Sequence, residues 1–130
     1  MAKNMTIRSE NDIFLAVNSV RCMANSITFS KVDLQKVIVS VSELTHNILD
    51  HAGGLGEFSC EYISDKGLKI TVQDYGTGIK EIDKILNGDP NFNRKGLGLG
   101  LLGAKRLMDD LKIDTSERGT TIIAIKWKSS

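Results

Sequence analysis

The sequence has few of the features that would place it in a specialised class of protein. Its 130 residues hold only two cysteines, Cys22 and Cys60, which are too far apart for a metal-binding knuckle and too few for a disulfide framework. We therefore expect both to be buried free thiols. The formal net charge is +1 and both signs are dispersed, which gives no electrostatic footprint for nucleic acid or for an anionic membrane.

Long apolar runs are also absent. No segment reaches the length of a transmembrane helix, and the first residues lack the basic and then apolar pattern of a signal peptide. These absences predict a cytoplasmic protein that recognises its partners through a local site. What is present, 41% hydrophobic and 25% charged residues in 130, is typical of a single globular domain.

Hydrophobic spacing divides the chain into helices and strands. Apolar residues three or four apart predict helices, and strict alternation predicts strands. Ser9 and Ser30 have the position and chemistry of helix N-caps, and Gly53 and Gly54 are expected to end the second helix. The only proline, Pro90, lies in the most loop-like segment. The expected elements are an edge strand at 5–8, helices at 10–27 and 31–52, strands at 57–63 and 68–74, a short amphipathic piece at 79–86, a loop at 87–95, a helix after the glycines at 96–100, and strands at 112–115 and 120–127.

The helix expected at 31–52 carries Glu43 and Asn47 one turn apart. They lie beside the apolar stripe of the helix, so both side chains can project into a pocket next to the core. The alternative is a pair of solvated polar residues, which is the commoner reason for such spacing. A metal site on the same helix is disfavoured, because His46 and Asp50 share one face while His51 lies on another.

Asp74 closes the strand expected at 68–74. Continuing the alternation places this carboxylate on the apolar side of the sheet, which is costly unless a group donates hydrogen bonds to it. The alternative is that the strand has already ended and that Asp74 opens the turn containing Gly76 and Gly78.

Three alternating glycines, Gly96, Gly98 and Gly100, lead directly into a helical pattern. Such a run lets backbone N–H groups approach an anion at a helix N-terminus, and a phosphate site is the natural inference. Neither the Walker loop nor the dinucleotide-binding loop fits the surrounding residues. Glycines placed there only for close packing are the alternative.

The order of these pieces is more informative than any one of them. Glu-x-x-x-Asn at 43–47, Asp-x-Gly-x-Gly at 74–78, Gly-Leu-Gly-Leu-Gly at 96–100 and Gly-Thr at 119–120 resemble the N, G1, G2 and G3 boxes of the GHKL ATPase superfamily. Within it, the chain resembles the small serine/threonine kinases of bacterial sigma-factor regulation, including the switch kinases of the stressosome. The resemblance implies a single ATP-binding kinase domain over 1–130, built as a two-layer α/β sandwich of the Bergerat type. Its sheet would be mixed but mostly antiparallel, with helices on one face.

The resemblance also implies a role for each motif. Glu43 would be the catalytic base that accepts the proton of a serine or threonine hydroxyl, and Asn47 would bind Mg²⁺ at the ATP phosphates. Asp74 would accept a hydrogen bond from the adenine amino group. Thr120 would support the adenine end, although its neighbour Thr121 is an equal candidate while the phase of the last strand is open. The full set of residues implied in ATP binding is Asn47, Asp74, Gly76, Gly78, Ile79, Lys95, Gly96, Leu97, Gly98, Leu99, Gly100, Leu101 and Thr120.

The partner implied by the resemblance is a STAS-domain protein that carries the phosphorylated residue. A PP2C-type phosphatase or a sigma factor would be further partners. Two other functions stay open: a binding module that sequesters a sigma factor or activates a phosphatase, and a plain α/β domain that binds no nucleotide.

Overall fold

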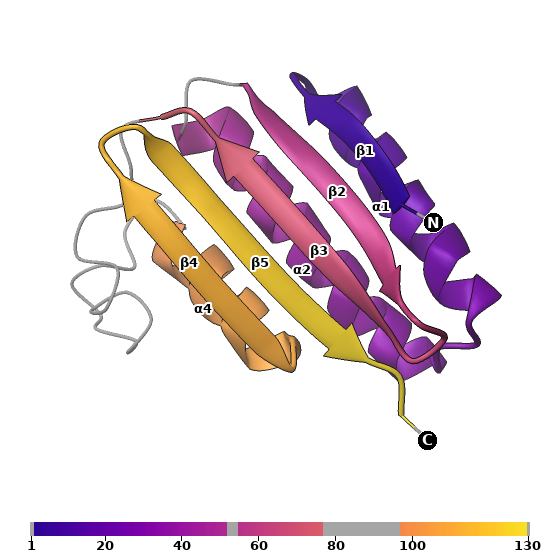
Figure 1. Cartoon of the computed structure of the whole chain (residues 1–130). Helices are drawn as coiled ribbons and strands as arrows, with labels where there is room; N and C mark the ends of the chain where they lie inside the picture. The colour runs from indigo at the N-terminus through magenta and orange to yellow at the C-terminus, as the bar shows by residue number, and fades with distance from the viewer. Residues whose placement is uncertain (1, 52–54, 77–96, 130) are drawn as a thin grey trace.

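The computed structural model describes residues 2–51, 55–76 and 97–129, of which 2, 51 and 97–99 are described by their backbone only. A five-stranded sheet lies on one side of three helices (Figure 1). In chain order the elements are β1 (Ala2–Ile7), α1 (Glu10–Ser26), α2 (Lys31–His51), β2 (Gly56–Ile63), β3 (Gly67–Asp74), α4 (Leu97–Leu107), β4 (Asp110–Ser116) and β5 (Gly119–Trp127).

Every strand pair among these elements is antiparallel. The order across the sheet is β1-β2-β3-β5-β4, so β5 lies between the two strands that precede it in the chain. The register pairs Gly56 with Asp74 and Asp74 with Thr120. The end of β3 is therefore flanked by the first residues of β2 and β5.

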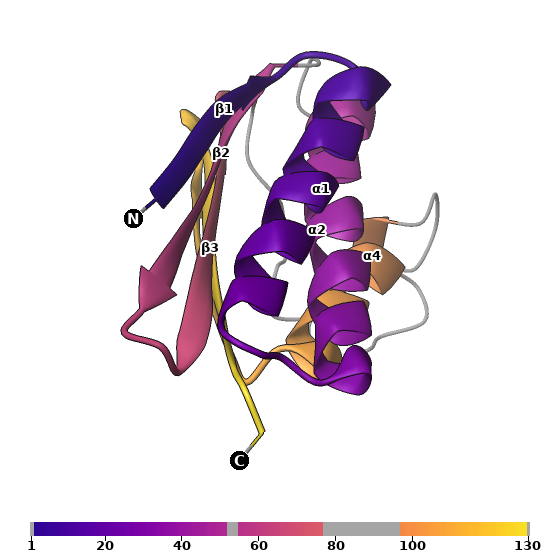
Figure 2. The same cartoon turned by 90° about the vertical axis from the view of Figure 1, so that its right-hand side faces the viewer.

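The helices all cover one face of the sheet, as Figure 2 shows from the side. α2 lies between α1 and α4 in both views. This arrangement confirms the expected two-layer α/β sandwich with helices on one face. Across the described ranges, no helix is both long and apolar enough to span a bilayer.

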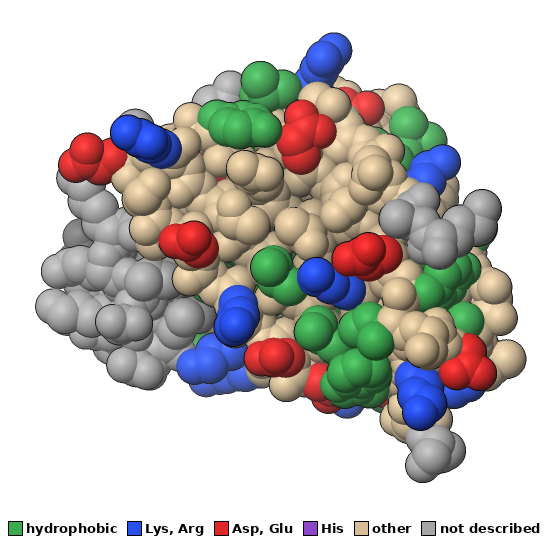
Figure 3. All heavy atoms as spheres, viewed as in Figure 1, with side chains coloured by type: hydrophobic (Ala, Val, Ile, Leu, Met, Phe, Trp, Pro, Cys, Tyr) green, Lys and Arg blue, Asp and Glu red, His purple; other side chains and the backbone are tan. Residues whose placement is uncertain are grey.

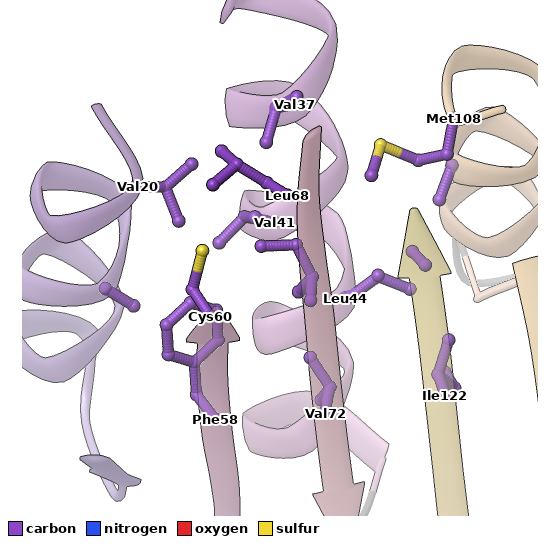
Figure 4. Close-up of a cluster of buried hydrophobic side chains, with 14 of the residues drawn as sticks. Val20, Val37, Val41, Leu44, Phe58, Cys60, Leu68, Val72, Met108 and Ile122 are labelled. Carbon is purple, nitrogen blue, oxygen red and sulfur yellow. The ribbon is translucent and has the colours of Figure 1, made fainter. Parts of the chain in front are cut away.

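The core fills the space between the two layers (Figure 4). Leu44 on α2, Phe58 on β2 and Leu68 on β3 are among the largest side chains with almost no exposed surface. The alternate residues of each strand face the opposite side of the sheet. There, acidic and basic side chains are interspersed with polar ones (Figure 3), and Lys69 pairs with Glu61 at 3.5 Å.

The predicted helix starts are confirmed by their capping bonds. The Ser9 hydroxyl accepts from the Asp12 amide at 3.4 Å, and the Ser30 hydroxyl accepts from the Asp33 amide at 3.1 Å. β2 begins at Gly56, one residue before the start of the strand expected at 57–63. Gly53, Gly54 and the elements expected at 79–86 and 87–95 lie outside the described residues.

The prediction that both cysteines are buried is wrong for Cys22. Cys60 is fully buried on β2, and burial raises the pKa of its thiol to about 12. Cys22 is exposed. The buried stripe of α1 runs through Ala16, Val20 and Ala24, and a residue two positions after Val20 points to another side of a helix with 3.6 residues per turn.

At the end of the sandwich where α2 begins, an ion cluster forms around the buried Lys126 of β5. Its ammonium lies 3.2 Å from both carboxylate oxygens of Asp109, just after α4, and 3.7 Å from Asp33 in the first turn of α2. Asp33 also accepts from the amide and hydroxyl of Ser129, at 3.0 and 2.6 Å. We call these four residues the clasp. It holds α2, the end of α4 and the end of β5 together.

Candidate functional site

The site is built first on the C-terminal half of α2. Glu43 and Asn47 lie one turn apart on this helix, with Glu43 exposed and Asn47 half-buried. The side-chain nitrogen of Asn47 is buried and has no hydrogen-bond partner in the described part of the chain. A buried donor without a partner costs about 1–3 kcal/mol, so this amide is poised for a group that the described residues do not supply.

The first turn of α4 lies directly against these two side chains. A Cβ atom on Gly100 would lie 3.0 Å from Glu43 Oε2 and 3.7 Å from Asn47 Oδ1. A side chain at this position would therefore press on the carboxylate. Gly100 leaves room beside the carboxylate and the amide at the start of a helix, where backbone N–H groups lack partners within the helix.

A second group of polar residues lies where β3 ends and β5 begins. Asp74 continues the alternation of β3 onto the helix-covered face, and its Oδ1 accepts from the Gly76 amide at 3.0 Å. Asp74 is therefore the last residue of β3 and lies on the apolar side, as the alternation predicts. The alternative, that the strand ends before Asp74, is wrong, although the side chain also bonds within the turn that follows. No other described residue donates to this carboxylate.

Gly119 allows β5 to start beside Asp74. Its φ of +141° is rarely adopted by residues with a side chain, and a Cβ atom there would collide with the Asp74 carbonyl oxygen. The next residue, Thr120, is 3% exposed and faces the helices, whereas Thr121 points to the open face of the sheet. The sequence left open which of the two threonines faces the helices. The register and burial of β5 place Thr120, and not Thr121, beside Asp74.

The two groups lie at the same end of the molecule. A Cβ atom on Gly56 would lie 2.7 Å from Ile48 Cδ1, so the residue after Asn47 sits directly on the start of β2. Gly56 pairs with Asp74, which pairs with Thr120. The fold thus brings together the end of α2, the start of α4 and the point where β3 ends and β5 begins, which are far apart in sequence. They lie around one corner of the sandwich, at the upper left of Figure 1.

Thr115 of β4 was missed from the sequence. Its hydroxyl lies 2.8 Å from the Thr120 hydroxyl, and so it orients the buried threonine. The signal was present, because Glu117 and Arg118 form a two-residue turn, and that turn fixes Thr115 opposite Thr120 in the hairpin.

Several predicted residues cannot be placed. Gly78, Ile79, Lys95 and Gly96 lie outside the described residues, as does Arg94. Leu97, Gly98 and Leu99 belong to the first turn of α4. Leu101 is 0% exposed in the core, so its side chain is not available to a ligand.

No protein-only metal centre exists in the described ranges, where no three His, Cys, Asp or Glu side chains converge. His46 instead donates from Nδ1 to the Ser42 carbonyl oxygen of its own helix at 2.7 Å, and its Nε2 lies 3.8 Å from Glu10. A Mg²⁺ ion here would need ligands from a bound phosphate. Such sharing is common for Mg²⁺, which keeps few protein ligands in nucleotide sites.

The residues present fit a nucleotide with its metal. The amide of Asn47 offers one oxygen and an NH2 group with no described partner, the start of α4 offers backbone donors, and Asp74 offers an acceptor at the sheet end. A carboxylate for proton transfer, Glu43, borders the same corner. The arrangement supplies what phosphoryl transfer mainly requires, namely positioning and charge neutralisation.

Comparison with known proteins agrees with this geometry. Residues 10–126 match the model of the histidine kinase-like ATPase domain family. The serine/threonine-protein kinase RsbT of Bacillus subtilis is 40% identical over 93% of this chain and 92% of its own. An anti-sigma F factor of Clostridium acetobutylicum is 30% identical over 92% of this chain and 87% of its own. The resemblance read from the four motifs is thereby confirmed.

A solved structure shares the fold at low sequence identity. The crystal structure of the SiaB-SiaC complex from Pseudomonas aeruginosa contains a chain that superposes with a TM-score of 0.72 at 15% identity. The match covers 95% of this chain and 88% of that one. The two chains therefore share a fold although few of their residues are identical.

Proposed function

The chain belongs to the histidine kinase-like ATPase domain family, and from this premise we propose that it is a cytoplasmic, ATP- and Mg²⁺-dependent serine/threonine protein kinase. We propose that residues 1–130 form a single kinase domain of the GHKL type. Its substrate would be a serine or threonine on a STAS-domain partner in a pathway that controls a bacterial sigma factor. The similarity to RsbT and to an anti-sigma F factor supports this class of pathway.

The observation that carries the proposal is the unpaired, buried nitrogen of Asn47 beside Gly100 and Glu43. An unpaired buried amide is unfavourable in the free protein, and it is tolerated where a ligand completes its bonding. Its position between a carboxylate and the start of a glycine-rich helix suits the phosphates of ATP. A buried amide retained only for stability would have a partner in its own chain.

Each residue then has a distinct task. Asn47 would hold Mg²⁺ through its side-chain oxygen, and Gly98 and Gly100 would let the backbone of α4 approach the phosphates. Bound ATP·Mg²⁺ supplies the phosphoryl group and neutralises its charge. Glu43 would take the proton of the incoming hydroxyl, which makes that oxygen a better nucleophile towards the γ-phosphorus.

The sheet end would hold the base of the nucleotide. Asp74 keeps one oxygen bonded to the Gly76 amide, which fixes the carboxylate and leaves the other oxygen for the adenine amino group. Thr120 would support this end, with its hydroxyl oriented by Thr115. Gly78, Ile79, Lys95, Gly96, Leu97, Leu99 and Leu101 stay in the proposed set of ATP contacts, Leu101 through its backbone alone.

The test is transfer of label from ATP to a panel of purified STAS-domain proteins, with and without Mg²⁺. We expect Glu43→Gln to lower transfer by about 10²- to 10⁴-fold, the range for loss of a general base. Binding of ATP·Mg²⁺ by this variant should be unchanged in calorimetry. Full transfer activity in Glu43→Gln would rule out the role of this carboxylate.

A matched control is available on the open face of the sheet. Glu61 is an exposed carboxylate paired with Lys69, and Glu61→Gln removes the same charge far from the corner. Its transfer rate should equal that of the wild-type protein. If no member of the panel accepts label from the wild-type protein, the STAS substrate is rejected, and candidate sigma factors and phosphatases are then tested for binding.

A second function is favoured by one finding, the similarity to an anti-sigma F factor. In that case the protein would work chiefly by sequestering a sigma factor, or by activating a PP2C-type phosphatase. Binding of such a partner that survives both the loss of Asn47 and the absence of ATP would favour this function. Capture that strictly requires ATP and leads to phosphate transfer would favour the kinase.

A further inference from the structure

The outer surface of the helix layer carries a groove between α2 and α4. It has a volume of about 420 Å³ and lies on the side of the helices away from the sheet. Its lining comes from both helices and consists of Lys31, Val32, Gln35, Lys36, Val39 and Leu107. Two of these apolar side chains are unusually open to solvent, with Val32 65% exposed and Val39 45% exposed.

The groove leads towards the proposed catalytic base. Val32, Lys36, Val39 and Glu43 follow one another at intervals of three or four residues, so they form one stripe along the exposed side of α2. Glu43 lies one turn beyond Val39, and the whole stripe from Val32 spans about 16 Å of helix. A bound segment would therefore lie next to the carboxylate proposed to act on the substrate hydroxyl.

α4 accompanies this stripe in the opposite direction. Gly100 near its start lies against Glu43, and Leu107 at its end lines the groove beside Val32 and Val39. Figure 2 shows the two helices side by side. The groove thus has a wall on each side, one of which also carries the proposed phosphate site.

Positive charge lies along the α2 side of the apolar floor. Lys31 and Lys36 line the groove, and Lys105 and Arg106 are exposed in the last turn of α4, next to Leu107. None of the four forms an ion pair with an acidic residue in the described part of the chain. The nearest carboxylates in sequence, Asp33 and Asp109, are bound instead to Lys126 in the clasp.

We infer that this groove is the docking surface for an acidic segment with apolar side chains, carried by the STAS-domain partner. The inference rests on the proposed function, because it names the surface by which that partner is held while its hydroxyl reaches Glu43. The two cations that line the groove, Lys31 and Lys36, lie beside a floor of valine and leucine and complement such a segment in charge and in polarity. Nucleic acid is a poor fit, since base or phosphate contacts gain nothing from an exposed aliphatic floor.

The first experiment reverses charge in the groove. The double variant K31E/K36E is compared with the wild-type protein in transfer of label to the STAS panel at saturating ATP. We expect kcat/KM for the protein substrate to fall at least tenfold through KM, with kcat and the affinity for ATP·Mg²⁺ unchanged. K66E/K112E is the matched control, because it changes the net charge equally at two exposed lysines away from the groove, and it should match the wild-type protein within twofold.

A second variant tests the apolar floor without changing charge. Replacing Val32 and Val39 by serine should also raise KM for the protein substrate and leave the affinity for ATP·Mg²⁺ unchanged. Because both valines are exposed, their loss should not lower the free energy of unfolding, so a folding defect is separated from a docking defect.

The outcomes separate this inference from the proposed function. Label transfer that is equal in K31E/K36E and the control would overturn the docking surface and leave the kinase intact. Absence of transfer, with STAS binding that is lost only in the groove variants, would overturn the kinase and support the docking surface. Absence of both transfer and binding would overturn both. Self-association of this chain that the groove variants abolish would overturn the STAS occupant in favour of a second copy.

Discussion

The two ends of α2 differ in how their polar groups are satisfied. At the N-terminal end, Asp33 is bound by Ser129 and Lys126, and Lys126 is bound in turn by Asp109. At the C-terminal end, the buried nitrogen of Asn47 has no described partner, and Glu43 is exposed against the open space left by Gly100.

The difference separates a stabilising end from a binding end of the same helix. A cluster whose members satisfy one another contributes to folding, and breaking it leaves a buried charge behind. An unpaired group costs free energy in the free protein and recovers it when a ligand binds. The comparison makes opposite predictions for substitutions at the two ends.

The largest effect is expected from Lys126→Met in the clasp. Removing this cation leaves the buried carboxylate of Asp33 without its counter-ion, which should lower the free energy of unfolding by about 3 kcal/mol. Chemical denaturation measures this loss. Lys69→Met is the matched control, because Lys69 pairs with Glu61 at the surface, and its loss should cost less than about 1 kcal/mol. A lower affinity for ATP·Mg²⁺ in folded Lys126→Met would break the comparison by showing that the two ends are coupled.

At the opposite end, Asn47→Ala should spare the fold and remove binding. Without nucleotide, its free energy of unfolding should be unchanged or up to about 1 kcal/mol higher, because an unsatisfied amide is removed. A ligand at a hundred times its Kd stabilises the folded state by about 2.7 kcal/mol, and the variant should lose this gain with ATP·Mg²⁺. Thermal unfolding with and without the nucleotide measures both. Marked destabilisation of the free variant would show that the amide is structural.

A smaller effect is expected from Gly100→Ala, with Gly103→Ala as its matched control. Both replace a glycine within α4, which should favour the helix by up to about 1 kcal/mol. The new Cβ at 100 lies 3.0 Å from Glu43 Oε2, whereas the new Cβ at 103 has no atom within 4 Å. We therefore expect about tenfold slower phosphoryl transfer, or about 1.4 kcal/mol, for Gly100→Ala alone. Equal rates of phosphoryl transfer in the two variants would contradict the placement of α4 against Glu43.

The smallest effect is a dependence of stability on pH at the clasp. Hydrogen bonds from Ser129 hold the pKa of Asp33 below its ordinary value. A carboxylate with a depressed pKa stabilises the folded state fully above its unfolded-state pKa, and the contribution is lost as the pH falls through the folded-state value. The free energy of unfolding should therefore decline as the pH falls below about 4. Asp33→Asn should show a weaker decline, and an identical decline would exclude Asp33 as the source.

Much of the fold was predictable because local patterns determine it. The caps at Ser9 and Ser30 begin α1 and α2, and alternation gives the two strands that end at Ile63 and Asp74. The order of the four motifs then identified the family, since few folds need those residues in that sequence.

The rest depends on contacts between residues far apart in the chain. The clasp joins positions 33, 109, 126 and 129, and only the folded chain brings these charges together. The choice between Thr120 and Thr121 likewise required the register of β5 against β3.

The position of Trp127 determines what an optical experiment on this protein can observe. It is the only tryptophan of the chain, its backbone amide donates to Asp109 at 2.7 Å, and the residue is 43% exposed at the end of β5. Intrinsic fluorescence therefore reports on the clasp, at the end of the sandwich opposite to Asn47. Emission should follow unfolding faithfully while responding little to nucleotide, so binding is better followed with a fluorescent ATP analogue.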